Sequence, residues 1–343
     1  MSRRRALFRY LAARLALVPV MLWLIASLVF LLLRVAPGDP VDAVLGTRAP
    51  EAARAALRSQ LGLDRSLLEQ YGQFLGNLLR GNLGESLNSQ EPVARIIGQS
   101  LPASLELGIT ALLLAAVMGL AVGFSGIARP EGKIDLAGRL YGVGTYALPP
   151  FWAAMLVQLV FAVWLGWLPV GGRFPATLVP PAGSGFYLLD SLRQGLGSGD
   201  WQALMGSLRH LTLPACTLAL LLSGIFTNAL RLNLRRALAS DYVEAARSRG
   251  IGERQVVLRH ALPNALLPVL TITGITVASL IGGALLIEVT FSWPGIAFRL
   301  QEAIAQRDYP LVQGIVVVVA ALVVLVTVTV DLLVALLDPR VRF

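Results

Sequence analysis

The sequence is poor in charged residues. Only 14% of its 343 residues are Asp, Glu, Lys or Arg, whereas 56% are hydrophobic. Soluble globular domains carry about 25% charged residues, and so few charges over this length cannot cover a water-exposed surface. The composition therefore excludes an ordinary soluble protein and indicates an integral membrane protein.

Reactive and metal-binding side chains are also scarce. The chain has one cysteine, Cys216, which excludes an intrachain disulfide and a Cys-rich metal site. Its only lysine, Lys133, is not followed by Ser or Thr, so the G-x-x-x-x-G-K-[ST] loop that cradles nucleotide phosphates is absent. Ser125 lies in a G-x-S-G stretch, but His210 is predicted at the opposite membrane face, about 30 Å away, and His260 lies in a separate charged loop. We therefore predict no catalytic residue, no enzyme activity and no cofactor or metal bound by this chain.

Six apolar windows are long enough to cross a bilayer, which takes about 20 residues, and none contains a charged residue. Lipid offers no hydrogen-bond partner to backbone groups, so such spans must be helices. The longest window is interrupted by Pro149 and Pro150, which predicts a kink or tilt. We therefore predict an all-α integral membrane fold with six transmembrane helices. The windows cover residues 15–33, 107–128, 140–170, 211–230, 265–287 and 311–330.

The basic residues predict which ends of these helices face the cytoplasm. The first window follows a basic start as a signal peptide would, but it lacks an A-x-A cleavage pattern and is interpreted as a retained anchor. With a cytoplasmic N-terminus, the cytoplasmic segments hold 16 of the 29 basic residues, and the exterior segments hold 12 over roughly twice the length. This bias predicts an N-in/C-in topology and explains the net charge of +9 without a nucleic-acid partner. The cytoplasmic segments are 1–10, 127–140, 231–263 and 339–343, and the exterior segments are 34–103, 169–209 and 291–310.

The topology divides the chain into three regions. The first exterior segment contains amphipathic stretches at 51–63 and 67–84, whose apolar residues recur at helical spacing. The second, 169–209, is rich in Gly and Pro, which predicts a structured loop with a short helix near 185–193. The tryptophans at predicted outer span ends, which suit a membrane-interface belt, are Trp164, Trp167 and Trp293. The three regions are 1–33, the cytoplasmic N-terminus and first transmembrane helix; 34–103, an exterior helical segment; and 104–343, the transmembrane domain.

A charged helical segment, residues 240–263, lies between two apolar windows. Asp241 with Glu244 three residues later is the pattern of a capping box at a helix start, and Gly250 permits the left-handed cap that ends a helix. A second short helix follows and is predicted to end at Pro263. Connections between packed helices usually span 2–8 residues, and this one spans about thirty, which favours a docking surface. The small residues that would allow close approach of a partner are Ala245, Ala246 and Gly250. The arginines that would form a polar rim around them are Arg247, Arg249 and Arg254. The positive-inside rule alone also accounts for each of these arginines.

The stretch "EAARSRGIGERQVVLRHALP" (244–263) resembles the E-A-A, three residues, G, nine residues, I-x-L-P signature of ABC importer permeases. His260 stands where the general pattern has isoleucine, and the matching positions are Glu244, Ala245, Ala246, Gly250, Leu262 and Pro263. Ala297 stands where the peptide branch of the family usually has glycine. Seven further stretches look like the dipeptide/oligopeptide (peptide/nickel) permeases: "RVAPGDP" (34–40), "LGLDRSLLEQY" (61–71), "GNLGESL" (81–87), "LGWLPVGGRF" (165–174), "FSWPGI" (291–296), "RDYPLVQG" (307–314) and "LLDPRVR" (336–342).

The resemblance implies a permease subunit of an ATP-driven importer of di- or oligopeptides in the bacterial inner membrane, with a type I ABC importer permease fold. It implies as partners a second homologous permease, two ATPase subunits that carry ATP and Mg²⁺, and an extracytoplasmic substrate-binding protein, whose contact we expect on 34–103 and 169–209. An importer of nickel, glutathione or another small solute is the alternative, and a secondary carrier or structural membrane subunit is the alternative from another class. The residues that the resemblance assigns to ATPase coupling are Asp241, Glu244, Ala245, Ala246, Arg247, Gly250, Leu262 and Pro263.

Three residues are predicted near a gate or pathway: Glu288, Trp293 and Asn228. Glu288 and Asp331 lie at span ends, where water or a partner arginine can reach them, so interface pairing is expected of both. Glu288 also precedes "FSWPGI", which leaves a role near the exterior gate open. Asn228 is predicted either to join two helices or to line the path.

Overall fold

The computed structural model describes residues 3–35, 38–46, 48–126 and 132–337. These residues form helices, and the single β pairing among them is an isolated bridge between Glu85 and Pro92. The predicted all-α fold is therefore confirmed. The helices are α1 (Arg3–Val35), α2 (Pro40–Leu45), α3 (Glu51–Gln60), α4 (Leu67–Leu79), α5 (Val93–Phe124), α6 (Lys133–Ala147), α7 (Pro150–Gln158), the π-helix η1 (Leu159–Trp164), α8 (Tyr187–Ser198), α9 (Gln202–Leu238), α10 (Asp241–Ser248), α11 (Glu253–Gln255), the π-helix η2 (Val256–Ala261), α12 (Leu262–Gly283), α13 (Leu285–Thr290), α14 (Ile296–Ala305) and α15 (Tyr309–Leu337).

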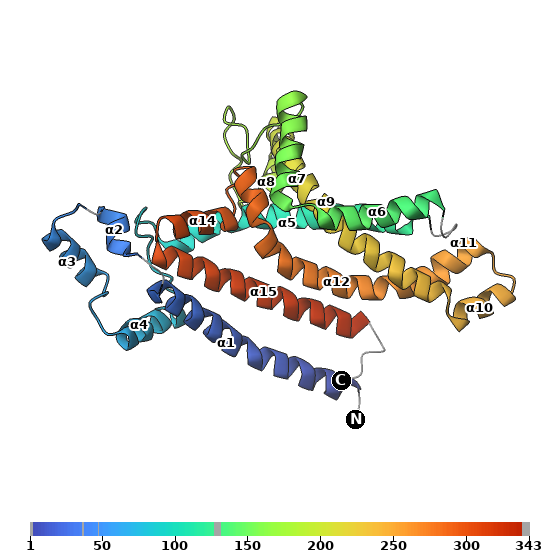
Figure 1. The fold of residues 1–343 in the computed structure, drawn as a ribbon, viewed down its shortest axis with the longest axis horizontal. Coiled ribbons are helices and arrows are strands. Elements are labelled where there is room, and N and C mark those ends of the chain that lie inside the picture. The colour runs from blue at the N-terminus through green and yellow to red at the C-terminus, as the bar shows by residue number, and fades with distance from the viewer. Residues whose placement is uncertain (1–2, 36–37, 47, 127–131, 338–343) are drawn as a thin grey trace.

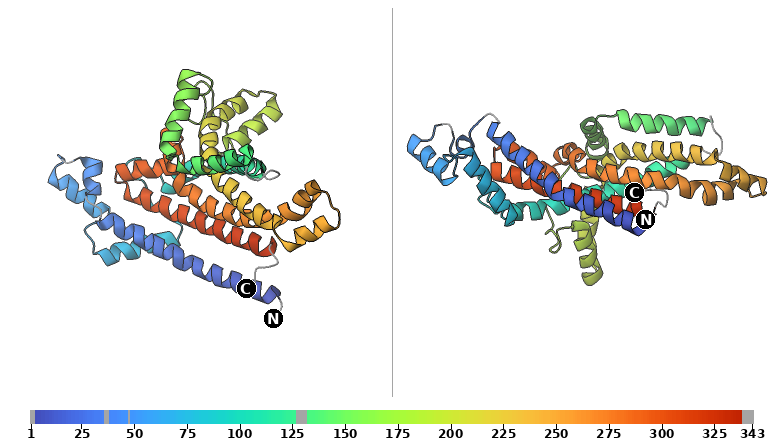
Figure 2. Two further views of the ribbon diagram at one scale, coloured as in Figure 1. Left: turned by 45° about the vertical axis from the view of Figure 1, so that its right-hand side comes forward. Right: turned by 90° about the horizontal axis from the view of Figure 1, so that it is seen from below.

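The long helices form an elongated bundle in which α9 is central. It packs against α5, α6 and α12, while α15 packs between α12 and α1. Helices α2 to α4 lie at one end of the bundle, α10 and α11 lie at the opposite end, and α7 projects from its side (Figures 1 and 2). The arrangement therefore places α2 to α4 far from α10 and α11.

Within the described residues, five helical segments are long and apolar enough to span a membrane, and a sixth is added if the bent pair of α6 and α7 with η1 counts as one span. The pair bends by 102°, which confirms the break predicted at Pro149 and Pro150. Leu148 and Pro149 both have extended backbones, with ψ of 124° and 128°. A residue that precedes proline avoids the helical region, so the tandem prolines end α6 and begin α7. The five segments are Arg14–Val35, Val93–Phe124, Gln202–Leu238, Glu253–Gly274 and Tyr309–Leu332.

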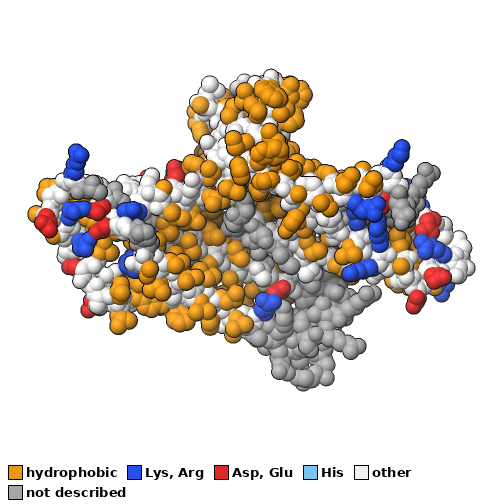
Figure 3. All heavy atoms as spheres, viewed as in Figure 1, with side chains coloured by type: hydrophobic (Ala, Val, Ile, Leu, Met, Phe, Trp, Pro, Cys, Tyr) orange, Lys and Arg blue, Asp and Glu red, His pale blue; other side chains and the backbone are white. Residues whose placement is uncertain are grey.

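Hydrophobic side chains cover the middle of the molecule and charged side chains gather at its two ends (Figure 3). Leu24, Leu28 and Leu32 on α1 are each more than half exposed. Exposed apolar rows of this length are stable in lipid and not in water. One charge pair lies on the flank between the ends, where Arg14 binds Asp331 at 3.0 Å. The interface pairing predicted for Asp331 is therefore confirmed.

The two predicted exterior segments contain the helices expected in them. Helices α3 and α4 lie within the stretches predicted at 51–63 and 67–84, and α8 covers most of the helix predicted near 185–193. Helix α5 begins at Val93, so the region boundary placed after residue 103 falls inside a helix. Pro102 is accommodated within that helix.

Close packing of α5 on α9 depends on small residues. A Cβ atom on Gly119 would lie 2.5 Å from the backbone oxygen of Ser223, and one on Gly123 would lie 3.2 Å from Leu230. Small residues at a helix crossing let two backbones approach closely, as membrane helices require. The α5–α9 pair is thereby held at a short distance along the centre of the bundle.

Candidate functional site

The elbow, residues 240–263, is fixed to the bundle along one edge of α10. Val243 is fully buried and Ala246 is 6% exposed, and both pack in an apolar cluster with Leu234 of α9 and Val256 of η2. Burial of a valine side chain stabilises by about 2 kcal/mol. Helix α10 therefore sits at a fixed position on α9 and η2, and its opposite face is exposed.

The start of α10 differs from the prediction. Ser240 is the N-cap residue and Asp241 is the first helical residue, so the capping box predicted from Asp241 and Glu244 is wrong. The Ser240 hydroxyl instead donates to the carbonyl oxygen of Ala237, in the last turn of α9. Asp241 and Glu244 both lie in the first turn, where negative charge stabilises the positive end of the helix dipole.

The predicted end of α10 at Gly250 is confirmed. Gly250 has a φ of +77°, its N–H donates to the Arg247 oxygen at 2.9 Å, and the Ile251 N–H donates to the Ala246 oxygen at 3.4 Å. These two bonds form a Schellman motif, which requires a left-handed residue and therefore favours glycine. The turn after α10 is closed by backbone hydrogen bonds rather than left as a free linker.

The second part of the elbow continues into the membrane span. The prediction that Pro263 ends this helix is wrong, because α11, η2 and α12 are consecutive and Pro263 lies in the first turn of α12. A proline ring clashes with the carbonyl four residues earlier in a regular α-helix. The π-helical turn η2 changes that register, with the Leu262 N–H donating to the Val257 oxygen. The chain can therefore pass Pro263 without a break, and α11 is continuous with the span.

An ion pair joins the two parts of the elbow. Arg247 donates to both carboxylate oxygens of Glu253, at 2.6 and 3.0 Å. These hydrogen bonds to the Glu253 carboxylate raise the pKa of Arg247. Both side chains are exposed, so the pair sets the position of α10 on α11 more than it stabilises the fold.

The structure separates the predicted coupling residues into two sets. Leu262 is half-buried, and Ala246 is buried against α9 and η2, so the expectation that Ala246 offers a direct contact surface is not supported. Ala246 instead anchors the helix. The side chains exposed on the elbow, where the coupling role remains a prediction, are Asp241, Glu244, Ala245, Arg247, Arg249, Arg254 and Pro263, with Gly250 exposed beside them.

A buried charge cluster at the base of the elbow was missed by sequence reasoning. The Asp135 carboxylate of α6 is buried, and it pairs with Arg231 and Arg235 of α9 and with Arg139. Arg231 is also buried. From the sequence alone these arginines indicate only topology, although one acidic residue among many basic ones on neighbouring helices was available as a signal. The cluster ties α6 to the segment of α9 that carries α10.

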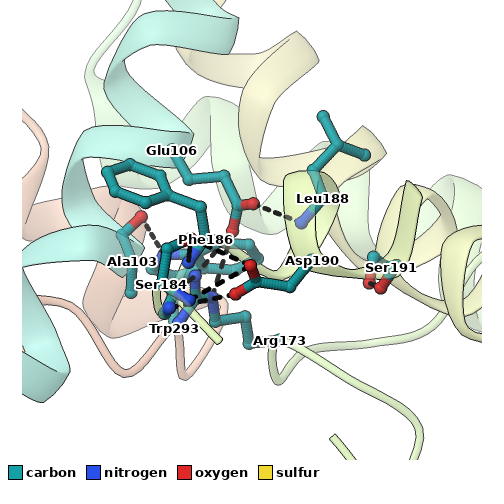
Figure 4. Close-up of polar contacts among 11 residues, drawn as sticks. Ala103, Glu106, Arg173, Ser184, Phe186, Leu188, Asp190, Ser191 and Trp293 are labelled. Carbon is teal, nitrogen blue, oxygen red and sulfur yellow. Dashed lines mark hydrogen bonds and ion pairs between the residues drawn. The ribbon is translucent and has the colours of Figure 1, made fainter. Parts of the chain in front are cut away.

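A second polar cluster lies beneath α8 (Figure 4). Glu106 of α5 accepts hydrogen bonds from Arg173 Nη2 at 2.7 Å and from the Leu188 N–H of α8 at 2.6 Å. The Arg173 guanidinium lies 3.9 Å from the centroid of the Tyr187 ring and also donates to the Gly185 oxygen. Glu106 and Arg173 are both buried. This pair holds the 165–186 loop and the start of α8 on α5.

Glu288 is not paired with an arginine in the described structure, so the interface pairing predicted for it is wrong. The residue is fully buried, and its carboxylate accepts from the Ser104 hydroxyl at 2.5 Å and from the Phe298 N–H at 2.9 Å. The Phe298 N–H belongs to the first turn of α14, a position that favours a negative charge. A Cβ atom on Gly295 would lie 2.3 Å from the same carboxylate. Glu288 also lines an apolar cavity between α5, α12 and α15, in which Ser104 is the other polar lining residue among those described.

The two other predicted pathway residues contact neighbouring helices. Trp293 is buried and its indole N–H donates to the Ala103 oxygen at 2.9 Å, so its assignment to a membrane-interface belt is wrong. Trp164 and Trp167 are exposed, as such a belt requires. Asn228 donates to the Gly142 oxygen at 3.3 Å, which makes it a contact between α9 and α6.

Sequence motifs that are far apart in the chain meet in two groups. In the first, the Gly172 N–H of the 165–174 motif donates to the Phe291 oxygen of the 291–296 motif at 2.8 Å. In the second, Ser86 of the 81–87 motif bonds to Asp308 at 2.5 Å, and the Tyr309 hydroxyl donates to the Gly38 oxygen at 3.3 Å. The second group therefore joins the ends of α1 and α14 and the start of α15. What these motifs share is therefore that they hold helix ends together.

Comparisons with known proteins match nearly the whole length of this chain. The family described as "Binding-protein-dependent transport system inner membrane component" matches residues 95–343, and the N-terminal family of the same systems matches residues 7–108. The di/tripeptide transport system permease of Pseudomonas aeruginosa is 39% identical, over 97% of this chain and 98% of the relative. The dipeptide transport system permease of Alkalihalophilus pseudofirmus is 35% identical, over 96% and 97%. The probable D,D-dipeptide transport system permease of Escherichia coli is 37% identical, over 92% of each chain.

Likeness to solved structures is weaker. The crystal structure of an amino acid ABC transporter with histidines aligns with 72% of this chain and 95% of its own, at a TM-score of 0.48 and 16% identity. The assignment of the family therefore depends on the sequence matches. With these matches and its apolar helices, the chain belongs to the family of inner membrane components of binding-protein-dependent transport systems, as a multi-pass ABC transporter permease.

Proposed function

We propose that this chain is a permease subunit of an ATP-driven importer of di- and oligopeptides. The three relatives are permeases for dipeptides or tripeptides by name, and each aligns along nearly the whole chain. This likeness favours peptides over nickel, glutathione or another small solute. It also favours a component of an ABC transporter over a secondary carrier or structural subunit.

The chain supplies half of the translocation pathway, and a second homologous permease supplies the other half. Two ATPase subunits bind ATP and Mg²⁺, and an extracytoplasmic substrate-binding protein delivers the peptide. The N-in/C-in topology places the elbow in the cytoplasm and places segments 34–103 and 169–209 outside, where they contact the binding protein. Glu288 and Trp293, which hold the start of α14 and the end of α13 on α5, belong to the exterior gate.

The observation that carries the coupling proposal is that α10 is fixed to the bundle along one edge and exposed on the other. Its exposed face is available to a partner, while Val243 and Ala246 fix its other face to α9 and η2. A push on α10 therefore reaches α9 through Leu234 and reaches α12 through the continuous helix after Glu253. The Asp135 cluster carries the same displacement to α6. A free linker of this length would absorb such a displacement.

The energy that the elbow transmits can be bounded. Moving a two-state bundle from 1:99 to 99:1 takes about 5.5 kcal/mol of differential binding. In alternating access, ATP binding favours one orientation of the bundle and hydrolysis restores the other. The contact between α10 and the ATPase has to transmit a free-energy difference of that size. Helix α10 can do so because backbone hydrogen bonds close its C-terminal end and one of its edges is buried.

A double substitution in the elbow tests the proposal. Glu244→Lys reverses a charge on the exposed face, and Gly250→Pro cannot adopt the observed φ of +77°. In the complete transporter reconstituted in proteoliposomes, we expect this variant to insert but to lose ATP-driven peptide uptake and co-purification of the ATPase subunits.

A matched control exists at the opposite end of the bundle. Glu51 lies in the first turn of α3, and Gly62 follows the C-cap of that helix with a φ of +66°. Glu51→Lys with Gly62→Pro should retain the ATPase subunits on purification. Wild-type uptake and ATPase retention by the elbow variant would show that coupling runs elsewhere.

A further inference from the structure

A polar pocket lies where the end of α1, helix α4 and the start of α15 meet. Arg34 of α1 lines it together with Gln70 and Gln73 of α4 and Gln313 of α15. Among its described lining residues there is no Asp or Glu. The pocket therefore carries one full positive charge and several amide groups, without a carboxylate to balance the charge.

The Arg34 guanidinium is held in place from three sides. Its Nε donates to Gln70 Oε1 at 2.8 Å, and Gln70 Nε2 in turn donates to the Arg65 oxygen at 2.9 Å. The guanidinium carbon lies 4.8 Å from the centroid of the Phe30 ring and 5.6 Å from that of Tyr309. The charge is thus oriented toward a fixed position before any ligand arrives.

Two donors in this pocket have no acceptor among the described residues. Arg34 Nη1 and Gln313 Nε2 are both buried, and neither makes a hydrogen bond to the part of the chain that the structure describes. A buried donor without a partner costs about 1–3 kcal/mol, and native structures rarely leave two in one place. A neutral water molecule could accept from both atoms but would leave the guanidinium charge unbalanced. An anion satisfies both the donors and the charge.

The depth of the pocket identifies the source of the anion. Arg34 lies at the last turn of the Arg14–Val35 span, which is the level of the lipid headgroups. Directly along α1 from it, Leu28, Leu31 and Leu32 are each more than half exposed. An anion at the position of Arg34 that also carries acyl chains would lay those chains on this exposed face of α1.

We propose that the pocket binds the phosphate group of a membrane phospholipid, with Arg34 Nη1 and Gln313 Nε2 as its donors. Guanidinium groups bind phosphate through charge-assisted hydrogen bonds. The bound phosphate joins α1 to α15 and α4 at one end of the bundle. This role does not depend on which solute the transporter carries.

The test is lipid binding by the complete, delipidated transporter, measured by titration with short-chain phosphatidylglycerol. We expect saturable binding that weakens at least tenfold in Arg34→Gln and also in Gln313→Leu. The matched control is Arg80→Gln, an exposed arginine at the end of α4 outside the pocket, which should bind as the wild type does. Equal binding by all four proteins would overturn the proposal.

Competition on the wild type distinguishes a lipid from a free anion without any mutation. Inorganic phosphate should displace the lipid only at concentrations far above those of the lipid itself. If inorganic phosphate binds as tightly as the phospholipid, or if a high-resolution map of the transporter in lipid contains only water beside Arg34 and Gln313, the lipid assignment is wrong. These measurements decide the matter even if Arg34→Gln does not assemble.

Discussion

Removal of Arg173 should release the 165–186 loop from α5. Glu106 is 6% exposed and accepts from Arg173 Nη2, Arg173 Nε and the Leu188 N–H, at 2.7, 3.2 and 2.6 Å. In Arg173→Met the Glu106 carboxylate loses the charged partner but stays buried. Breaking a buried ion pair from one side costs about 3–5 kcal/mol. We therefore expect the free energy of unfolding to fall by about that amount.

A second substitution should recover much of this loss. Glu106→Gln removes the charge but keeps an oxygen that can accept from the Leu188 N–H, so Arg173→Met with Glu106→Gln leaves no buried charge unpaired. The assay is unfolding in mixed detergent micelles, followed by tryptophan fluorescence, because Trp293 is buried with its indole 5.8 Å from the Arg173 guanidinium. Arg193→Met on the exposed face of α8 is the control. If Arg173→Met is no less stable than the control, or the double variant is no more stable than Arg173→Met, the reasoning fails.

Two further predictions concern the buried carboxylates of Asp135 and Glu288. Asp135→Asn should leave Arg231 buried without an anionic partner and lower the free energy of unfolding by about 3–5 kcal/mol in the same assay. Arg139→Gln removes an exposed arginine from the same carboxylate and should lower it by less than about 1 kcal/mol. Equal losses in the two variants would contradict the role of the Asp135 cluster. Gly295→Ala should lower the free energy of unfolding by about 1–3 kcal/mol, because its Cβ atom would overlap the Glu288 carboxylate. The control is Gly197→Ala in α8, where a Cβ atom meets nothing within 4 Å and the substitution should be neutral or stabilising. If Gly295→Ala is neutral, the Glu288 carboxylate does not lie beside Gly295.

The parts of the fold that the sequence predicted are those set by local composition. Apolar windows defined the membrane helices because bilayer thickness fixes their length. Pro149 with Pro150, and Gly250, marked a bend and a helix end because their backbone preferences act within a few residues. The exposed elbow was predicted because its charges stand out between two apolar runs.

The parts that escaped prediction depend on contacts between distant segments. Glu106 meets Arg173, and Asp135 meets Arg231, only because α5 and α6 pack on their partners. The burial of Ala246 depends on which edge of α10 turns toward α9, and the passage of Pro263 depends on a π-helical turn before it. Periodicity within one segment predicts neither the buried edge of α10 nor the π-helical turn. The same is true of the Arg34 pocket, to which three separate helices contribute.

We propose that this chain conducts peptide but does not drive its own transport. The most direct measurement compares uptake of a radiolabelled dipeptide into proteoliposomes that contain the chain alone under an imposed proton gradient with uptake by the complete transporter supplied with ATP. We expect accumulation against the gradient only in the complete transporter with ATP. Sustained uphill accumulation by the isolated chain, driven by the proton gradient, would contradict it.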